Sequence, residues 1–197
     1  MTEQFQETGQ SMLTDAKLLT QLQAGDDASF EALFRRHYDQ TYHILYRLLG
    51  NKADAEDVAQ QVFLKLYQSP HRVRLQGDET NVAGWLYRVA VNTGYNVLRS
   101  QKRRQLRQER WSWWWPFSGP TDPADVSETN DLQSRVRQTL VRMKPRDAKL
   151  LILRHSGLSY RELASVLEVA PGSIGSLLTR AERAFAQKYR LAYPEQE

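Results

Sequence analysis

The chain has 197 residues, 41% of them hydrophobic, which suffices for one large or two small hydrophobic cores. Its formal net charge of +4 favours an anionic partner, and the absence of cysteine excludes disulfides and thiolate metal sites and favours a reducing compartment. No segment approaches the roughly 20 consecutive apolar residues that cross a bilayer, and residues 1–10 lack the features of a secretory signal. We therefore expect a soluble, cytoplasmic protein with no membrane insertion.

The N-terminal part of the chain has the apolar spacing of helices. After a polar tail of residues 1–12, hydrophobic residues recur every three or four positions, without the sustained alternation of a strand. The first strong helix carries Phe30 and Phe34 on its apolar face and ends at Gly50. The pattern predicts an all-helical domain over residues 13–110.

A second helix is predicted to begin near Asn51 and to end at Pro70. Acidic residues in its first turn suit the positive end of the helix dipole. Its buried face would hold Val58, Val62, Phe63 and Leu66. The polar stretch that follows, residues 71–80, indicates a loop.

A long helix is predicted over residues 85–110, and its character changes along its length. In the first half a polar and aromatic face runs beside the apolar one, stepping by three or four positions through Trp85, Arg88, Asn92, Asn96 and Arg99. The second half is basic, and its positive side chains include Lys102, Arg103 and Arg104. Nucleic acid is the expected counter-charge.

Residues 111–130 break the helical periodicity, and their prolines and acidic residues indicate an interdomain linker. The linker is rich in aromatic residues, namely Trp111, Trp113, Trp114, Trp115 and Phe117. This patch fits a membrane-surface contact, a docking surface for a regulator, or an apolar bridge between domains. Pro116 argues against the amphipathic helix that a membrane contact needs, so we favour partner or interdomain packing.

A smaller second domain is predicted over residues 131–193, a range with twelve basic and five acidic residues. Pro145 suits the first position of a helix that runs to His155 and is capped by Gly157. The net charge of +7 in this range exceeds that of the whole chain, so the rest of the chain is net acidic.

The second domain contains the pattern of a helix-turn-helix. Ser159 and Glu162 have the spacing of a capping box, in which each side chain satisfies the other residue's backbone amide. A turn at residues 169–172 leads into a second helix with an apolar side of Ile174, Leu177, Leu178, Ala181 and Phe185. The second helix of such a unit normally lies in the DNA major groove. An ordinary helical hairpin is the alternative, and the basic surroundings favour DNA binding.

Several runs of residues together resemble the extracytoplasmic-function (ECF) sigma factors. The C-terminal runs that are similar to region four of that family are LSYRELA at 158–164, PGSI at 171–174 and RAER at 180–183. The N-terminal runs that are similar to region two are FEALF at 30–34, DAEDVAQQVF at 54–63 and WLYRVAVN at 85–92. The resemblance covers roughly three quarters of the chain. Several motifs in the same order are much harder to match by accident than a single helix-turn-helix.

The resemblance implies a sigma factor that binds core RNA polymerase and directs promoter-specific transcription initiation. Region two would read and melt the downstream promoter element, region four would read the upstream element, and an anti-sigma factor would hold the protein inactive. The clamp of the largest polymerase subunit would bind Asp54, Glu56, Asp57, Gln60 and Gln61. Without the motif, a solvated helix face would be the simpler interpretation of these residues.

The same resemblance makes the polar face of the long helix the strand-capturing surface, with Trp85, Arg88, Asn92, Asn96 and Arg99 facing DNA. Aromatic rings, amides and guanidinium groups suit the capture of unstacked bases, while Lys102, Arg103 and Arg104 would contact phosphates. For Trp85 alone, a core position is an equal alternative.

The chain departs from the family pattern in its recognition helix. The family usually has a lysine and an arginine where this chain has Gly175 and Leu177. DNA reading in this helix would then depend on Ser173, Ser176, Thr179, Arg180 and Arg183. Gln61 and Asn96 also stand where the family often has acidic residues.

Other functions are less well supported by the residues. The four histidines are scattered, and no glycine-rich phosphate loop, activated serine or acidic metal cluster is present. We therefore expect no metal, no cofactor and no intrinsic catalysis, which argues against an enzyme acting on nucleic acid. A free-standing helix-turn-helix regulator is the main alternative, but it would leave the polar faces of the N-terminal domain without a role.

Overall fold

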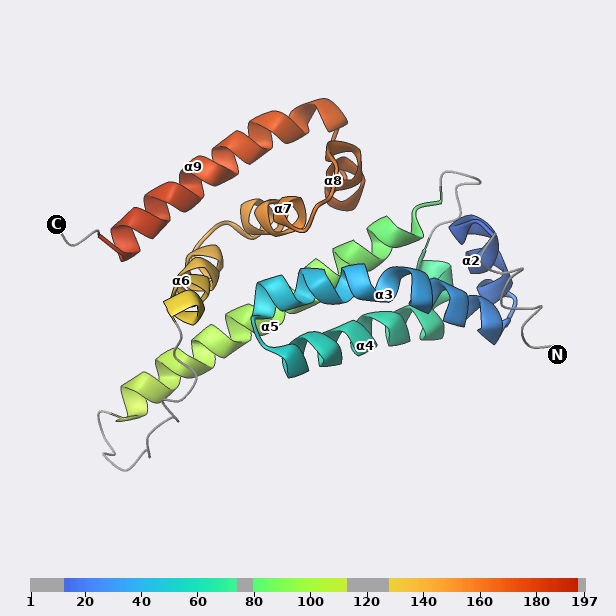
Figure 1. The fold of residues 1–197 in the computed structure, drawn as a ribbon, viewed down its shortest axis with the longest axis horizontal. Coiled ribbons are helices and arrows are strands. Elements are labelled where there is room, and N and C mark those ends of the chain that lie inside the picture. The colour runs from blue at the N-terminus through green and yellow to red at the C-terminus, as the bar shows by residue number, and fades with distance from the viewer. Residues whose placement is uncertain (1–12, 74–79, 113–127, 195–197) are drawn as a thin grey trace.

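The computed structural model describes residues 13–73, 80–112 and 128–194, and every regular element in these ranges is a helix (Figure 1). The predicted tail and most of the aromatic linker, residues 113–127, lie outside the described residues. Within the part of the chain that is described, no helix has the length and apolar character needed to cross a membrane. The prediction of an all-helical fold with two helical domains is confirmed.

The N-terminal domain consists of α2 (Asp15–Gln23), α3 (Asp27–Leu49), α4 (Lys52–Gln68) and α5 (Val82–Ser112), with a 3₁₀ turn at Pro70–Arg72 between α4 and α5. The longest of these, α5, continues slightly beyond the predicted start of the linker.

Capping residues in the sequence set the bounds of these helices. The Asp26 carboxylate accepts a hydrogen bond from the Ala28 amide at the start of α3, and Gly50 ends that helix with a φ of 71°. The Asn51 side chain caps α4 in the same way, through the Asp54 amide. These caps place α3 and α4 side by side as an antiparallel pair.

A close crossing joins α3 to α5. Gly94 lies against the side chains of Leu45 and Leu48, and an added Cβ would come within 2.8 Å of both. Such a distance is too short for a real carbon contact, so the missing side chain sets how near the two helices approach. The side chains around this crossing, including Leu86 and Val91, are buried.

The C-terminal domain consists of α6 (Glu128–Val141), α7 (Pro145–His155), α8 (Tyr160–Leu167) and α9 (Ile174–Ala192), with a 3₁₀ turn at Pro171–Ser173. The predicted start of α7 at a proline is confirmed. The predicted capping box is also present, since Ser159 accepts from the Glu162 amide and the Glu162 side chain accepts from the Ser159 amide at 2.7 Å. Helix α6 begins three residues before the predicted domain.

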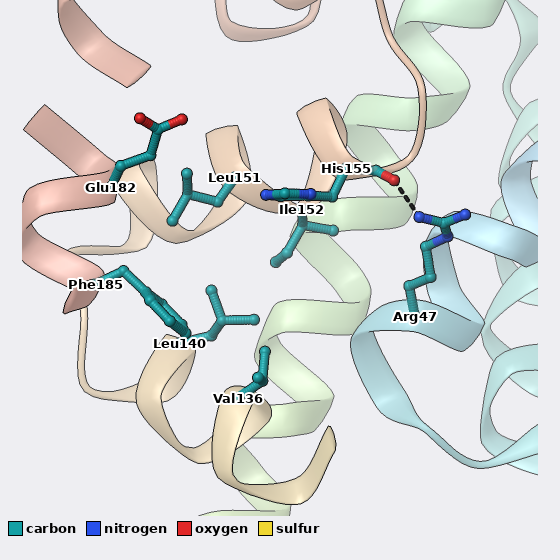
Figure 2. Close-up of a pocket in the computed structure, with 8 residues that line it drawn as sticks. All are labelled: Arg47, Val136, Leu140, Leu151, Ile152, His155, Glu182 and Phe185. Carbon is teal, nitrogen blue, oxygen red and sulfur yellow. Dashed lines mark hydrogen bonds between the residues drawn. The ribbon is translucent and has the colours of Figure 1, made fainter. Parts of the chain in front are cut away.

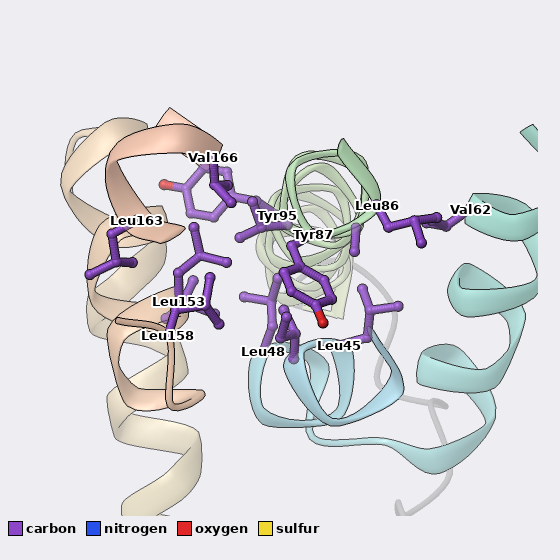
Figure 3. Packing of buried hydrophobic residues seen from close by; sticks show 14 of the residues in the cluster. Leu45, Leu48, Val62, Leu86, Tyr87, Tyr95, Leu153, Leu158, Leu163 and Val166 are labelled. Atoms are coloured by element: carbon purple, nitrogen blue, oxygen red, sulfur yellow. The ribbon is translucent and has the colours of Figure 1, made fainter. Parts of the chain in front are cut away.

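The two domains pack against each other through α5. Helices α3 and α4 cover one side of α5, and α6, α7 and α8 contact another, while α9 packs on the C-terminal domain and lies beyond α7 as seen from α5 (Figure 1). Figure 3 shows the same arrangement from close by, with Leu158 and Val166 on one side of α5 and Leu45 and Val62 on others. The buried side chains form one continuous cluster across the two domains.

Candidate functional site

An open groove lies between the exposed edges of α3 and α4. Its volume is about 520 Å³, and its walls combine aromatic rings with polar side chains: Phe30, Phe34, Asp57, Gln60, Gln61, Phe63, Leu64 and Tyr67. The rings contact one another, with Phe34 and Phe63 centroids 4.8 Å apart and Phe30 and Tyr67 centroids 5.1 Å apart. We call this feature the α3/α4 groove.

Three of the five predicted polymerase-binding residues line the α3/α4 groove. Asp57, Gln60 and Gln61 are exposed beside it. The other two have partners within the domain: Asp54 accepts a hydrogen bond from Gln101 of α5 at 2.8 Å, and Glu56 forms an ion pair with Lys52. Of the predicted polymerase-binding residues, only the later ones along α4 therefore line the groove.

Sequence reasoning missed two large apolar side chains at this site. Leu64 is 51% exposed and Tyr67 is 44% exposed, although hydrophobic residues of this size are usually buried. They lie four and seven positions after Gln60, so the helical repeat places all three on one face of α4. A hydrogen bond to Asp27 raises the pKa of the Tyr67 hydroxyl. Phe30 and Phe34, which the pattern assigned to the core, also line the groove and are only partly buried.

The predicted DNA face of α5 is divided into two parts. Asn96, Arg99, Arg103 and Arg104 are exposed, and Lys102 is partly exposed. By contrast, Trp85, Arg88 and Asn92 are only partly exposed, and Arg88 and Asn92 contact the C-terminal domain. The Trp85 ring contacts the hydrophobic core, as the alternative interpretation expected.

Arg88 is held by the C-terminal end of α8. Its Nε and one Nη nitrogen donate to the carbonyl oxygens of Val166 and Ser165, both at 2.9 Å. The other Nη nitrogen pairs with the carboxylate of Glu168. Asn92 has a partner from the same domain, since its side-chain oxygen accepts a hydrogen bond from the Lys149 ammonium at 2.5 Å.

The predicted DNA-reading side chains of α9 lie together on its exposed side: Ser173, Ser176, Thr179, Arg180 and Arg183. The hydroxyls of Ser176 and Thr179 donate to carbonyl oxygens of their own helix turn, at 3.0 and 3.1 Å. Arg180 lies 3.5 Å from the buried carboxylate of Asp147 in α7. The Arg180 guanidinium therefore forms an ion pair within the domain while its side chain stays exposed to solvent.

The two departures from the family pattern differ structurally. At Gly175 an added Cβ would meet only a Tyr160 ring carbon at 4.0 Å, an ordinary contact distance. Leu177 is partly buried against the hydrophobic core, so it has a packing role in α9. A basic side chain is thus sterically possible at position 175 and would disturb packing at position 177.

A second pocket of about 320 Å³ lies among α6, α7 and α9 of the C-terminal domain, next to α3 of the N-terminal domain (Figure 2). Figure 2 shows Leu140 of α6, Ile152 of α7 and Phe185 of α9 around it, with Arg47 of α3 at its edge. Arg47 donates to the carbonyl oxygen of His155, which joins α3 to the end of α7. We call this feature the α6/α7/α9 pocket.

The fold and these surfaces define a two-domain, helix-turn-helix DNA-binding protein with an additional open groove on its N-terminal domain. Family models match both domains: residues 33–104 match Sigma-70 region 2 and residues 133–185 match Sigma-70 region 4. The chain is 30% identical over 185 residues to the ECF RNA polymerase sigma-E factor of Escherichia coli strain K12, covering 89% of this chain and 94% of the relative. The chain therefore belongs to the ECF sigma factors, and it directs transcription initiation.

Other relatives agree with this assignment. The RNA polymerase sigma-H factor of Pseudomonas aeruginosa strain PAO1 is 28% identical over 182 residues, which cover 86% of this chain and 91% of the relative. The solved structure of CnrH, determined in complex with the cytosolic domain of CnrY, has the same fold with a TM-score of 0.58 and 17% identity, covering 91% of this chain and 99% of CnrH. A free-standing regulator is not favoured, because both sigma regions are present in order.

Proposed function

We propose that the α3/α4 groove binds the clamp of the largest subunit of core RNA polymerase. The observation that carries this proposal is the exposure of Leu64 and Tyr67 beside the polar side chains of Asp57, Gln60 and Gln61. An apolar groove with a polar rim is the usual composition of a protein interface. The aromatic residues that line it give a docking helix a preformed surface.

We further propose a separate DNA role for each of the two domains. Trp85, Arg88, Asn92, Asn96 and Arg99 would capture the melted strand of the downstream element. The exposed Arg103 and Arg104 side chains and the partly exposed Lys102 would hold its phosphates, and α9 would read the upstream element as a duplex. In this proposal the domains 13–110 and 131–193 supply promoter recognition and strand capture, and the polymerase supplies the catalysis. The protein is then a non-catalytic subunit of the polymerase, and it acts in the cytoplasm.

Charge reversal in the α3/α4 groove tests the polymerase proposal. Asp57→Arg places a cation among the exposed groove residues, and we expect its affinity for purified core polymerase to fall about tenfold, with a matching loss of run-off transcription. Asp131→Arg is the matched control, because Asp131 is an exposed carboxylate of α6 outside the groove. Equal polymerase affinity of the two variants would remove the groove from the interface.

An anti-sigma factor is the third proposed partner. CnrH, which shares this fold, was solved with the cytosolic domain of CnrY. In this chain the α6/α7/α9 pocket provides an apolar surface where side chains of three helices meet, with Glu182 and His155 at its edge. An inhibitor that uses this pocket should stop run-off transcription by the natural chain and act at least about tenfold more weakly on Phe185→Ala. Equal inhibition of both would place its site elsewhere.

A further inference from the structure

A series of aromatic rings follows one face of α3 and continues the α3/α4 groove. Its members recur at every fourth position and therefore share that face: Phe30, Phe34, Tyr38, Tyr42 and Tyr46. The last three rings are nearly parallel, with centroids 6.2 Å apart for Tyr38 and Tyr42 and 6.0 Å apart for Tyr42 and Tyr46. Tyr46 is 44% exposed and the other two are partly exposed. We call Tyr38, Tyr42 and Tyr46 the tyrosine row.

The surroundings of the tyrosine row are acidic. Burial raises the pKa of the Tyr38 hydroxyl, and the charges of Glu56 and Asp39 add to that effect, which places both carboxylates near this ring. Asp39 is exposed, and Glu56 is held by an ion pair with Lys52 that is itself exposed and so contributes little. Negative charge beside exposed aromatic rings favours a cationic partner.

A shorter series of rings on α9 has its cationic partner within the chain. The rings of Phe185, Tyr189 and Tyr193 follow one another at centroid distances of 5.8 and 5.2 Å. The Arg135 guanidinium of the neighbouring helix α6 lies 5.3 Å from the centre of the Tyr193 ring. The planar guanidinium of arginine stacks well on aromatic faces. A helix that carries arginine is therefore the kind of partner that fits such a series.

The second half of α5 is a helix of this kind. Arg99, Arg103 and Arg107 recur at every fourth position, so they share one face, and all three are exposed. Four residues of an α-helix rise by about 6 Å, which is also the spacing of the rings in the tyrosine row. Figure 1 shows this half of α5 projecting beyond the ends of α3 and α4, where another molecule can reach it.

We propose that the tyrosine row of one copy of this chain binds the arginines in the second half of α5 of another copy. The equal repeat of the two side-chain series and their opposite charge carry the inference. The chain self-associates through this contact because each copy has both surfaces. One helix face on another is a small interface, so the association is weak and depends on protein and salt concentration. Arg103 also belongs to the proposed phosphate-binding residues, and the two roles exclude each other at that side chain.

Sedimentation equilibrium of the full-length protein tests whether the chain self-associates. We expect the average mass to rise with protein concentration at low salt and to return toward that of a single chain at high salt, because the contact is between opposite charges. The mass of a single chain at every concentration would overturn the inference. An association that high salt leaves unchanged would also overturn it.

An exchange of charges identifies the two surfaces. Arg103→Glu and Asp39→Arg each set like charges against one another, and we expect either variant alone to associate at least about tenfold more weakly than the natural chain. An equimolar mixture of the two variants restores opposite charges and should regain most of the lost affinity. Arg142→Glu and Asp131→Arg are the matched controls, exposed and outside both surfaces, and should associate like the natural chain. A mixture that associates no more strongly than its components would overturn the pairing.

Substitution of one ring separates stacking from charge. Tyr42→Leu keeps an apolar side chain without the ring, and we expect about two- to fivefold weaker association, whereas Tyr42→Phe keeps the ring and should associate like the natural chain. Tyr160→Leu is the control, because Tyr160 is 48% exposed on α8, outside both surfaces. Thermal melting of each variant verifies that it folds. Equal losses in the leucine and phenylalanine variants of Tyr42, or no loss in either, would contradict the role of the tyrosine row.

Discussion

The two candidate DNA-reading helices, α5 and α9, differ in what covers them. On α9 the predicted contact residues are all exposed, although hydroxyls there donate to their own helix and Arg180 is drawn toward Asp147. On α5, Arg88 and Asn92 contact the C-terminal domain, whereas Asn96 and Arg99 and most of the basic second half of the helix are exposed. The expected DNA face is thus open along the whole of α9 and only in part along α5.

This difference separates two kinds of DNA binding in one chain. In the proposed roles, α9 meets duplex DNA with exposed side chains, whereas Arg88 and Asn92 already have hydrogen-bond partners in the C-terminal domain. The α3/α4 groove, where we propose that polymerase docks, has the exposed side chains of Asp57, Gln60 and Gln61 beside it.

The largest effect should come from the α3/α4 groove, which is open in the structure. Leu64→Glu puts a carboxylate into the α3/α4 groove, and we expect polymerase affinity to fall by about ten- to a hundredfold, since central apolar side chains dominate interface energies. Single-strand binding should stay the same, because Leu64 lines the α3/α4 groove and none of the predicted DNA-binding residues does. Leu132→Glu is the control, since Leu132 is similarly exposed, at 56%, but lies on α6. Competition binding to core polymerase measures the difference, and equal losses in both variants would contradict the assignment.

The next effect concerns the uncovered half of α5. Arg103→Ala combined with Arg104→Ala removes two exposed cations, and we expect about tenfold weaker single-strand binding at low salt. The slope of log affinity against log salt should become shallower by about 1.4, since each phosphate contact on a single strand contributes about 0.7. Fluorescence anisotropy across a salt series measures both quantities. An unchanged slope would contradict phosphate contacts by these two residues.

A third effect acts on the stability of the N-terminal domain and so on both of its surfaces. Burial alone would raise the pKa of Asp15, but hydrogen bonds and charge from His37 and Arg36 outweigh it and hold that pKa below its ordinary value of 3.8. Stabilisation by this carboxylate is therefore present above pH 4 and is lost as the pH falls through the lowered folded-state pKa. Asp15→Asn should lower the free energy of unfolding by about 1–2 kcal/mol at pH 7.

Urea titrations at several pH values measure this third effect. The difference between the natural chain and Asp15→Asn should shrink as the pH falls below about 4, because the carboxylate is then protonated. A difference that is constant with pH would show that the neutral hydrogen bonds, rather than the charge, hold α2 against α3. Polymerase and DNA binding should change together if the domain unfolds as one unit.

The smallest effect should come from α9. Gly175→Lys adds a cation on an accessible side of the helix, where the nearest obstacle to a side chain is 4.0 Å away, and we expect about two- to fivefold tighter duplex binding at moderate salt. Gly175→Ala is the control, because it supplies the same gain in helix propensity without charge. A mobility-shift titration separates the two. If lysine and alanine give the same affinity, position 175 does not face DNA, and the missing family lysine has no consequence here.

Local signals made most of the fold predictable from the sequence. The capping box at Ser159, the helix end at Gly50 and the proline start of α7 each depend on a few neighbouring residues, and each is present in the structure. Helical spacing predicted α3, α4 and α5 for the same reason. The limits of the linker were less accurate, since α5 continues to Ser112 and α6 begins at Glu128.

The sites were predictable only where one helix supplies them. Asp57, Gln60 and Gln61 share a face of α4, so a single helical repeat places them together. The partners of Arg88 are about 80 positions further along the chain, and no periodicity relates them to it. The groove also escaped prediction, because the apolar pattern assigns Phe30 and Phe34 to the core without indicating that their outer edges remain open. Both the partners of Arg88 and the open edge of the groove depend on packing between residues that are far apart in the sequence.

The turn between α3 and α4 is constrained by a residue of the other domain. Gly50 ends α3, and an added Cβ there would overlap the guanidinium of Arg137 from α6, whose pKa burial lowers. Turns on a protein surface usually accept insertions and deletions without loss of stability. Here an insertion or deletion in the turn would displace Gly50, against which the Arg137 guanidinium packs. The turn is short and local in sequence, yet its tolerance to insertion should depend on whether the two domains are together or apart.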